Sequence, residues 1–179
     1  MRHTLAILVE NRFGELARIV GLFSARGYNI ESLTVAETLD PQISRVTLVT
    51  SGDEATIEQI IKQLDKQIRV LSVHDLSLRD HIEREMALLH ISTKSGTERT
   101  QVMRLAEIFE AKVIDASISA VTVQAVAERQ RLEEFLQLLA PFGINEIARA
   151  GTLAIGRLSA PTSREQLCQH EGSVKEHYG

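Results

Sequence analysis

Apolar residues in the first half of the chain follow two alternating patterns: short runs typical of β-strands, and segments with the spacing of an α-helix. In two segments apolar residues recur at positions i, i+3, i+4 and i+7, which is the spacing of one helix face. These residues are Leu16, Ile19, Val20 and Phe23 in the first segment and Ile57, Ile60, Ile61 and Leu64 in the second. Strands are predicted at 5–9, 30–36, 45–50 and 70–76, where apolar and β-branched residues concentrate. The predicted order is β-α-β-β-α-β, the ferredoxin-like arrangement.

The second half of the chain repeats this plan. Its two predicted helices carry the same spacing, at Val102, Leu105, Ala106 and Phe109 and at Leu132, Phe135, Leu136 and Leu139. Strands are predicted at 85–92, 113–118, 121–127 and 147–155. The repeat predicts an α+β protein with two ferredoxin-like βαββαβ domains, each an antiparallel sheet with both helices on one face.

Polar segments set the predicted limits of the two domains, which are residues 1–79 and 83–157. The charged residues around the boundary, among them His81 and Glu83, show no apolar periodicity and are predicted to form a solvated linker. Residues 158–179 are a polar tail that is expected to be mobile or loosely docked.

The overall composition excludes some classes of partner. The 179 residues include 20 Lys and Arg against 24 Asp and Glu, so the chain lacks the basic stripe of a nucleic-acid-binding protein. No apolar run approaches the roughly 18 residues that cross a bilayer, and no membrane association is expected. The single cysteine, Cys168, cannot form an internal disulfide, which indicates a reducing compartment and a cytoplasmic location. Two small cores with few aromatic residues favour pairing between copies of the chain.

The turn that joins the first strand to the first helix is the best candidate for a binding site. Free N–H groups and the helix dipole at a helix N-terminus favour a bound anion, and Gly14 lets a ligand approach the backbone. The side-chain carbonyl of Asn11 is a candidate acceptor for an ammonium group, so this turn is suited to a free amino acid. Asn29, at the far end of the same helix, offers a second amide. The alternative is that Asn11 and Gly14 only form a turn, as such residues commonly do.

No catalytic or metal-binding pattern stands out. The six histidines show no HExxH or comparable ligand spacing, and no GxGxxG or GxxxxGK[ST] motif occurs. His81 with Glu83 and Glu85 is explained more simply by a solvated linker than by acid–base chemistry. Cys168, His170 and His177 share the tail without the spacing of a zinc site. The chain is therefore not expected to be an enzyme by itself.

Several runs of residues resemble one protein family. They are Glu10-Asn11-x-x-Gly14-x-Leu16, RGYNIESLTV at 26–35, and, later in the chain, AEIF at 106–109 and EIARAG at 146–151. Together they resemble the small subunit of acetohydroxyacid synthase (acetolactate synthase), over about residues 1–157.

This resemblance implies that the first domain is an ACT domain, in which the sheets of two copies join into one continuous sheet. The feedback inhibitor, usually valine, binds where the two copies meet. One wall of that site is implied to come from Asn11 and from the backbone groups of Gly14, Glu15 and Leu16. The other is implied to come from Asn29 and Ile30 of the second copy, with Ala36 and Gln59 nearby or coupled to the site. The residues leave open whether the effector is valine, leucine or isoleucine.

The resemblance also implies a partner. The second domain resembles the family's C-terminal domain, which holds and activates a large catalytic subunit. Thiamine diphosphate, Mg²⁺ and FAD are expected on that subunit, and no cofactor is expected on this chain. Ala127–Arg131 departs from the family, which has a glycine-containing turn there. The alternative is an ACT-type amino-acid sensor for a different enzyme, and the effect of the chain on a thiamine-diphosphate-dependent synthase distinguishes the two.

Overall fold

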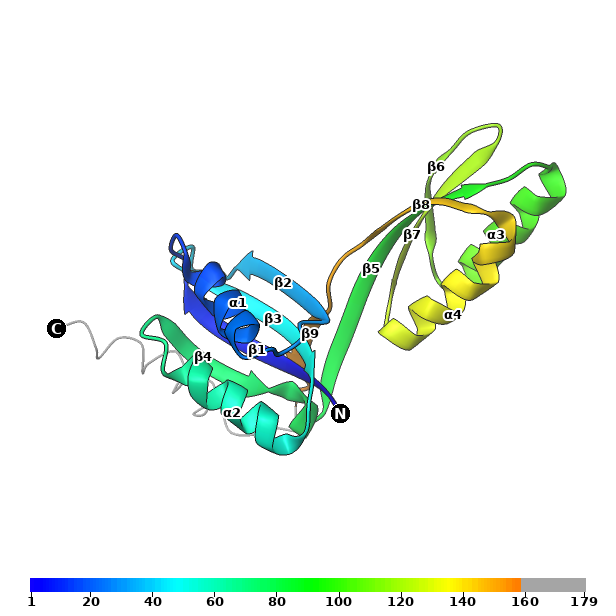
Figure 1. Cartoon of the computed structure of the whole chain (residues 1–179). Helices are drawn as coiled ribbons and strands as arrows, with labels where there is room; N and C mark the ends of the chain where they lie inside the picture. The colour runs from blue at the N-terminus through cyan, green and yellow to red at the C-terminus, as the bar shows by residue number, and fades with distance from the viewer. Residues whose placement is uncertain (159–179) are drawn as a thin grey trace.

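The computed structural model describes residues 1–158, which form two sheets with two α-helices packed on one face of each (Figure 1). The predicted fold class is confirmed. The predicted tail lies outside the described residues, apart from its first residue. No helix among the described residues is both long and apolar enough to cross a membrane.

The first domain contains a four-stranded antiparallel sheet with the order β2-β3-β1-β4. Its elements in chain order are β1 (Arg2–Glu10), α1 (Glu15–Ala25), β2 (Ser32–Glu37), β3 (Ile43–Ser51), α2 (Glu54–Asp65) and β4 (Val70–Asp75). Leu5 and Ile7 on β1 are fully buried against Phe23 of α1 and Ile60 of α2. Because β2 lies at one edge of the sheet, its outer side has no strand partner within the described chain.

The buried face of α1 includes Ile19 and Phe23 of the predicted apolar face but not Leu16 and Val20. Glu15, Ile19, Leu22 and Phe23 are buried, whereas Leu16 is 42% exposed and Val20 is only half-buried. At about 100° per residue, Leu16 and Val20 lie on the side of the helix opposite Arg18. Arg18 shares the carboxylate of Glu15 with Arg69, which directly precedes β4. Leu16 and Val20 are therefore on the side of α1 nearer β2.

The second domain repeats the arrangement, with the strand order β6-β7-β5-β8. A short 3₁₀ turn, η1 (Leu76–Leu78), leads into this domain. Its elements are β5 (His81–Ser92), α3 (Gly96–Ile108), β6 (Lys112–Ala116), β7 (Ala120–Ala127), α4 (Arg129–Leu139), η2 (Ala140–Phe142), β8 (Ile144–Arg149) and β9 (Leu153–Gly156). Phe109 and Phe135 stack with their ring centroids 4.8 Å apart, which joins the end of α3 to α4.

The prediction of a solvated linker is wrong. β5 begins at His81, and its first four residues pair with β9, while the rest of the strand pairs with β7 and β8. The Glu83 side chain is 14% exposed, and Glu85 is 7% exposed. The fold can bury these charges because each has an ionic partner, which is Arg2 for Glu83 and Arg149 for Glu85.

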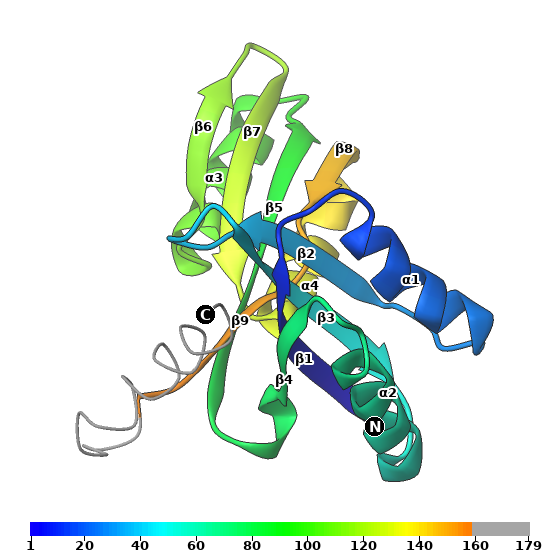
Figure 2. The same cartoon turned by 90° about the vertical axis from the view of Figure 1, so that its left-hand side faces the viewer.

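The two-stranded β5–β9 ladder lies against the face of the first sheet that carries no helices (Figures 1 and 2). Ala6, Leu76 and Ala154 form a small buried cluster there, and Arg45 Nη2 donates a 2.8 Å hydrogen bond to Ala154 O. We call the contacts between this ladder, α4 and the first sheet the junction. The junction brings together parts of the two domains that are far apart in the sequence.

Candidate functional site

The turn between β1 and α1 has an open amide acceptor. Asn11 Nδ2 donates hydrogen bonds to Glu37 Oε1 at 3.0 Å and to Pro41 O at 2.9 Å, and these bonds fix the orientation of the amide. Its side-chain carbonyl has no partner among residues 1–158. A carbonyl held in this way can accept a hydrogen bond from a ligand ammonium group.

The first turn of α1 has no side-chain cap, and of its N–H groups that of Glu15 donates to Arg12 O at 3.3 Å. Gly14, which precedes the helix, has φ of 88°, and no side chain accepts a hydrogen bond from the first N–H groups. In α2 and α3, by contrast, Asp53 accepts from Thr56 N and Ser95 accepts from Glu98 N. A Cβ added at Gly14 would meet nothing within 4 Å, so a ligand could approach the backbone there.

Glu15 does not place an unbalanced negative charge at this turn. Its side chain is buried and accepts hydrogen bonds from Arg18 Nη1 at 3.0 Å and Arg69 Nη1 at 2.9 Å. The carboxylate is therefore neutralised by two guanidinium groups. A ligand carboxylate at the N-terminus of α1 would meet helix N–H groups and not an unpaired like charge.

Asn29 and Ile30 lie beyond the opposite end of α1. The helix contains 11 residues, which gives it a length of roughly 16 Å. Asn29 O accepts a 2.6 Å hydrogen bond from Thr50 Oγ1, the Asn29 side chain is exposed, and Ile30 packs at the border of the core. One copy of the chain thus groups Asn11, Gly14, Glu15 and Leu16 but leaves Asn29 and Ile30 at the other end of the helix.

Apolar side chains are exposed beside the turn. Phe13 is fully exposed and Leu16 partly so, and both belong to the segment that the sequence analysis selected. Figure 2 shows α1 running along the same side of the first domain as β2. Gln59, which the resemblance placed near the site, accepts a 3.4 Å hydrogen bond from the hydroxyl of Tyr28. Ala36 lies on β2, opposite Arg45 of β3.

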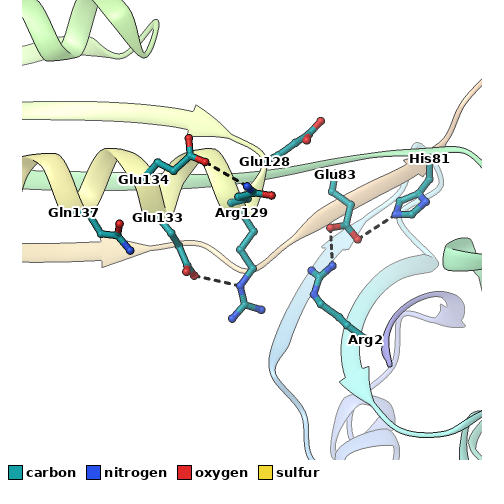
Figure 3. Close-up of a pocket in the computed structure, with 9 residues that line it drawn as sticks. Arg2, His81, Glu83, Glu128, Arg129, Glu133, Glu134 and Gln137 are labelled. Carbon is teal, nitrogen blue, oxygen red and sulfur yellow. Dashed lines mark hydrogen bonds and ion pairs between the residues drawn. The ribbon is translucent and has the colours of Figure 1, made fainter.

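A hollow that the sequence analysis did not predict lies at the junction and has a volume of about 600 Å³. Figure 3 shows Arg129 and Glu133 on one side of it and Arg2, His81 and Glu83 on the other. The residues that line it are Arg2, His81, Glu83, Glu128, Arg129, Gln130, Glu133, Glu134 and Gln137. The charged residues at 79–84 were the signal in the sequence that could have indicated this hollow, but they were interpreted as a solvated linker.

The charges in this hollow are largely paired with one another. Arg2 Nη1 lies 2.9 Å from Glu83 Oε2, and Arg129 Nε lies 3.3 Å from Glu133 Oε1. Burial of Glu83 acts to raise the pKa of its carboxyl group, but hydrogen bonds from Thr4 and Arg2 outweigh it, and the net effect is a lowered pKa. No group of three or more His, Cys, Asp or Glu side chains within the described part of the chain is placed to hold a metal ion.

Two family models match the chain. The model of the AHAS small subunit-like ACT domain matches residues 5–72, and the model of the small subunit of acetolactate synthase matches residues 84–158. The two segments that contain the predicted site residues, 11–16 and 29–30, fall within the match to the ACT-domain model.

Individual relatives match across both domains. The acetolactate synthase small subunit of Aquifex aeolicus is 42% identical over 87% of this chain and 81% of its own length. The acetolactate synthase isozyme 3 small subunit of Escherichia coli is 47% identical over 88% of this chain and 96% of its own length. A crystal structure of the acetolactate synthase small subunit from Thermotoga maritima superimposes with a TM-score of 0.82 at 35% identity, covering 89% of this chain and 99% of that one.

Proposed function

Because the chain belongs to the family of acetolactate synthase small subunits, we propose that it activates a catalytic subunit and confers feedback inhibition by valine on it. Membership of this family, with its ACT domain, makes the chain a regulatory subunit. Its partner is the large catalytic subunit of acetolactate synthase, an enzyme of branched-chain amino acid biosynthesis. Thiamine diphosphate, Mg²⁺ and FAD belong to that partner, and this chain contributes regulation without a catalytic group of its own.

The effector site is formed by two copies of the chain. If a two-fold axis lies beside β2, the two β2 strands run antiparallel, and so do the two α1 helices. The N-terminus of one α1 then lies near the C-terminal end of the other, where Asn29 and Ile30 are found. The separation of these residues along α1 is the observation that carries the proposal, because one copy cannot supply both walls.

Each part of valine has a suitable contact in this arrangement. The carboxylate is bound by the open N–H groups at the start of α1, and the ammonium group donates to the side-chain carbonyl of Asn11. Leu16 and Ile30 offer apolar surface to the branched side chain, and Phe13 is close enough along the chain to influence the choice of effector. A site of this kind suits a dissociation constant in the micromolar to millimolar range, roughly −4 to −8 kcal/mol.

The test is a valine titration of acetolactate production by the catalytic subunit, with and without this chain. We expect the chain to raise the activity and to make it sensitive to valine. Parallel titrations with leucine and isoleucine identify the preferred effector. If an active catalytic subunit gains neither activity nor valine sensitivity, the proposal is wrong and an ACT-type sensor for another enzyme is the better explanation.

A further inference from the structure

The chain reaches the second domain immediately after the two residues of the proposed second wall. Glu31 follows Ile30, and its carboxylate accepts hydrogen bonds from Ser51 Oγ and from Arg129 Nη1, the latter at 3.2 Å. The next residue, Ser32, accepts a 2.7 Å hydrogen bond from the backbone N–H of Thr152. The proposed site and the second domain are thus separated by only one or two peptide units.

This short segment is hydrogen-bonded to β3 on both sides of Ile30. Thr50 Oγ1 donates to Asn29 O at 2.6 Å, and Glu31 N donates to Val49 O at 2.8 Å. The hydrogen bond from Ser51 is the main reason for the lowered pKa of Glu31, which therefore carries its negative charge at neutral pH. A displacement of Asn29 or Ile30 would be transmitted to the side chains of Glu31 and Ser32.

Arg129 occupies a position that helix electrostatics disfavours. It is the first residue of α4, where the helix dipole repels a cation, and no side chain caps this helix. Two acidic residues compensate, since Arg129 lies 3.3 Å from Glu133 and 3.2 Å from Glu31. The pairing of Arg129 with Glu31 ties α4 to the residue next to Ile30.

The contact of Gly151 with the start of β2 is a steric one. A Cβ added there would lie 2.9 Å from the backbone oxygen of Leu33 and too close to Thr34 Oγ1. The neighbouring Thr152 is fully buried, and its hydroxyl donates to Glu85 Oε1 at 2.9 Å. Because backbone meets backbone at this point, β2 cannot shift towards the segment between β8 and β9 without moving it.

We propose that effector binding at Asn29 and Ile30 is transmitted to the second domain through two contacts: the Glu31–Arg129 ion pair, and the packing of Gly151 and Thr152 against the start of β2. This inference rests on the function proposed above. It gives the two contacts a coupling role and leaves effector binding to the residues already assigned. The junction is then the element whose arrangement differs between the effector-bound and effector-free states.

The ion pair is tested with Arg129→Gln, Glu31→Gln and the double variant, each assembled with the catalytic subunit. Because Arg129 is 44% exposed, its replacement should leave the fold intact. We expect the half-inhibiting valine concentration to rise roughly two- to five-fold, the range that an exposed ion pair can supply. The double variant should be affected by less than the sum of the two single variants, because each of the three removes the Glu31–Arg129 pair. Arg131→Gln is the control, since Arg131 packs on Phe109 away from the junction and should leave the inhibition curve unchanged.

The steric contact is tested with Gly151→Ala. Its control is Gly156→Ala on β9, where an added Cβ would meet nothing within 4 Å. We expect Gly151→Ala to raise the half-inhibiting valine concentration on the order of ten-fold. Isothermal titration calorimetry of the small subunit alone should show that the Gly151 and Arg129 variants still bind valine, because the residues assigned to effector binding are unchanged. In the unsubstituted chain, valine should alter hydrogen exchange at the Thr152 N–H.

Two results would contradict these proposals, and they can be distinguished from each other. If the unsubstituted holoenzyme is valine-sensitive and the Arg129 and Gly151 variants keep the same inhibition curve, the coupling inference is overturned and the proposed function stands. If the unsubstituted holoenzyme does not respond to valine, the proposed function fails and the coupling inference fails with it. If Gly151→Ala does not fold, the Arg129 and Glu31 series decides the question by itself.

Discussion

Gly14 and Gly151 are required for different physical reasons. Gly14 adopts a left-handed conformation with φ of 88°, but space around it is open, so backbone conformation and not crowding favours glycine in a single copy. Gly151 has no left-handed conformation, and its missing Cβ makes room for the backbone of Leu33. The first glycine leaves space for a ligand or a second copy, whereas the second closes a contact between domains.

The charge tolerance of the turn can be tested at Gly14. Asp and Asn both enter the left-handed region more readily than most residues, so Gly14→Asp and Gly14→Asn differ mainly in charge. We expect Gly14→Asp to raise the half-inhibiting valine concentration on the order of ten-fold or more, because its carboxylate repels that of the ligand. Gly14→Asn should have a smaller effect, and both should still activate the catalytic subunit. Equal valine titration curves for the two variants would contradict a carboxylate-binding role for this turn.

Individual residues of the candidate site could be selected from the sequence, but not their grouping. The spacing of Asn11 and Gly14 before a helix was enough to predict an open turn, and the structure has one. The pairing of Glu15 with Arg69 could not be predicted in the same way, because the two residues are 54 positions apart. The contact of Asn29 with the turn stays a prediction, since it needs a second copy.

At the scale of elements, α1 shows where periodicity succeeds and where it fails. The spacing at Leu16, Ile19, Val20 and Phe23 located the helix, but only Ile19 and Phe23 of these four are buried. The face that turns inward includes Glu15, which a hydrophobic pattern ignores because it is charged, although two arginines neutralise it. As a result Leu16 and Val20 form an apolar strip beside β2, which is available to another copy.

This strip predicts how the proposed dimer can be weakened. We expect Val20→Glu to shift the chain towards monomer, because it places a charge on the side of α1 that would face the second copy. Ala17→Glu is the control, since Ala17 is exposed on the outer side of the same helix. Sedimentation velocity of both variants, with and without valine, measures the change. A Val20→Glu chain that dimerises as well as the control would contradict pairing along β2 and α1.

The N-terminus of α3 offers a stability test away from the proposed site. Ser95 Oγ accepts a 3.1 Å hydrogen bond from Glu98 N and so caps this helix end, while the Glu98 carboxylate accepts a 2.6 Å hydrogen bond from Lys94 N. Ser95→Ala should destabilise the second domain by about 1 kcal/mol. Thr97→Ala, two residues further along, removes a similar hydroxyl that does not cap the helix and should have little effect. Urea denaturation with hydrogen exchange of the α3 amides distinguishes the two.

At the scale of the whole molecule, the repeat was visible in the sequence and the junction was not. Apolar spacing repeats within each half, so two βαββαβ units could be predicted from local patterns. The junction depends on pairs such as Arg2 with Glu83, whose members are 81 positions apart. Charges that are neutralised over such distances look like solvent-exposed residues in a sequence, which is why β5 was predicted to begin after a linker.

Glu83 makes the strength of this junction dependent on pH. Burial acts to raise the pKa of its carboxyl group, but hydrogen bonds from Thr4 and Arg2 hold the pKa below the ordinary value of 4.5. A group whose pKa is lowered by folding stabilises the folded state fully above its unfolded pKa, and this contribution is lost as the pH falls through the folded value. The junction should therefore keep its full strength at neutral pH and weaken below about pH 4.5.

Glu83→Gln separates this charge from the other contacts of the junction. At neutral pH the variant should be less stable than the unsubstituted chain by roughly 1–3 kcal/mol, because hydrogen bonds to a charged acceptor become bonds to a neutral one. The difference should shrink as the pH falls below about 4.5, since the unsubstituted chain then loses the same charge by protonation. Urea unfolding of both chains between about pH 3.5 and 7 measures it. If the difference stays constant across that range, Glu83 acts through its shape and not its charge, and the ion pair with Arg2 does not hold the domains together.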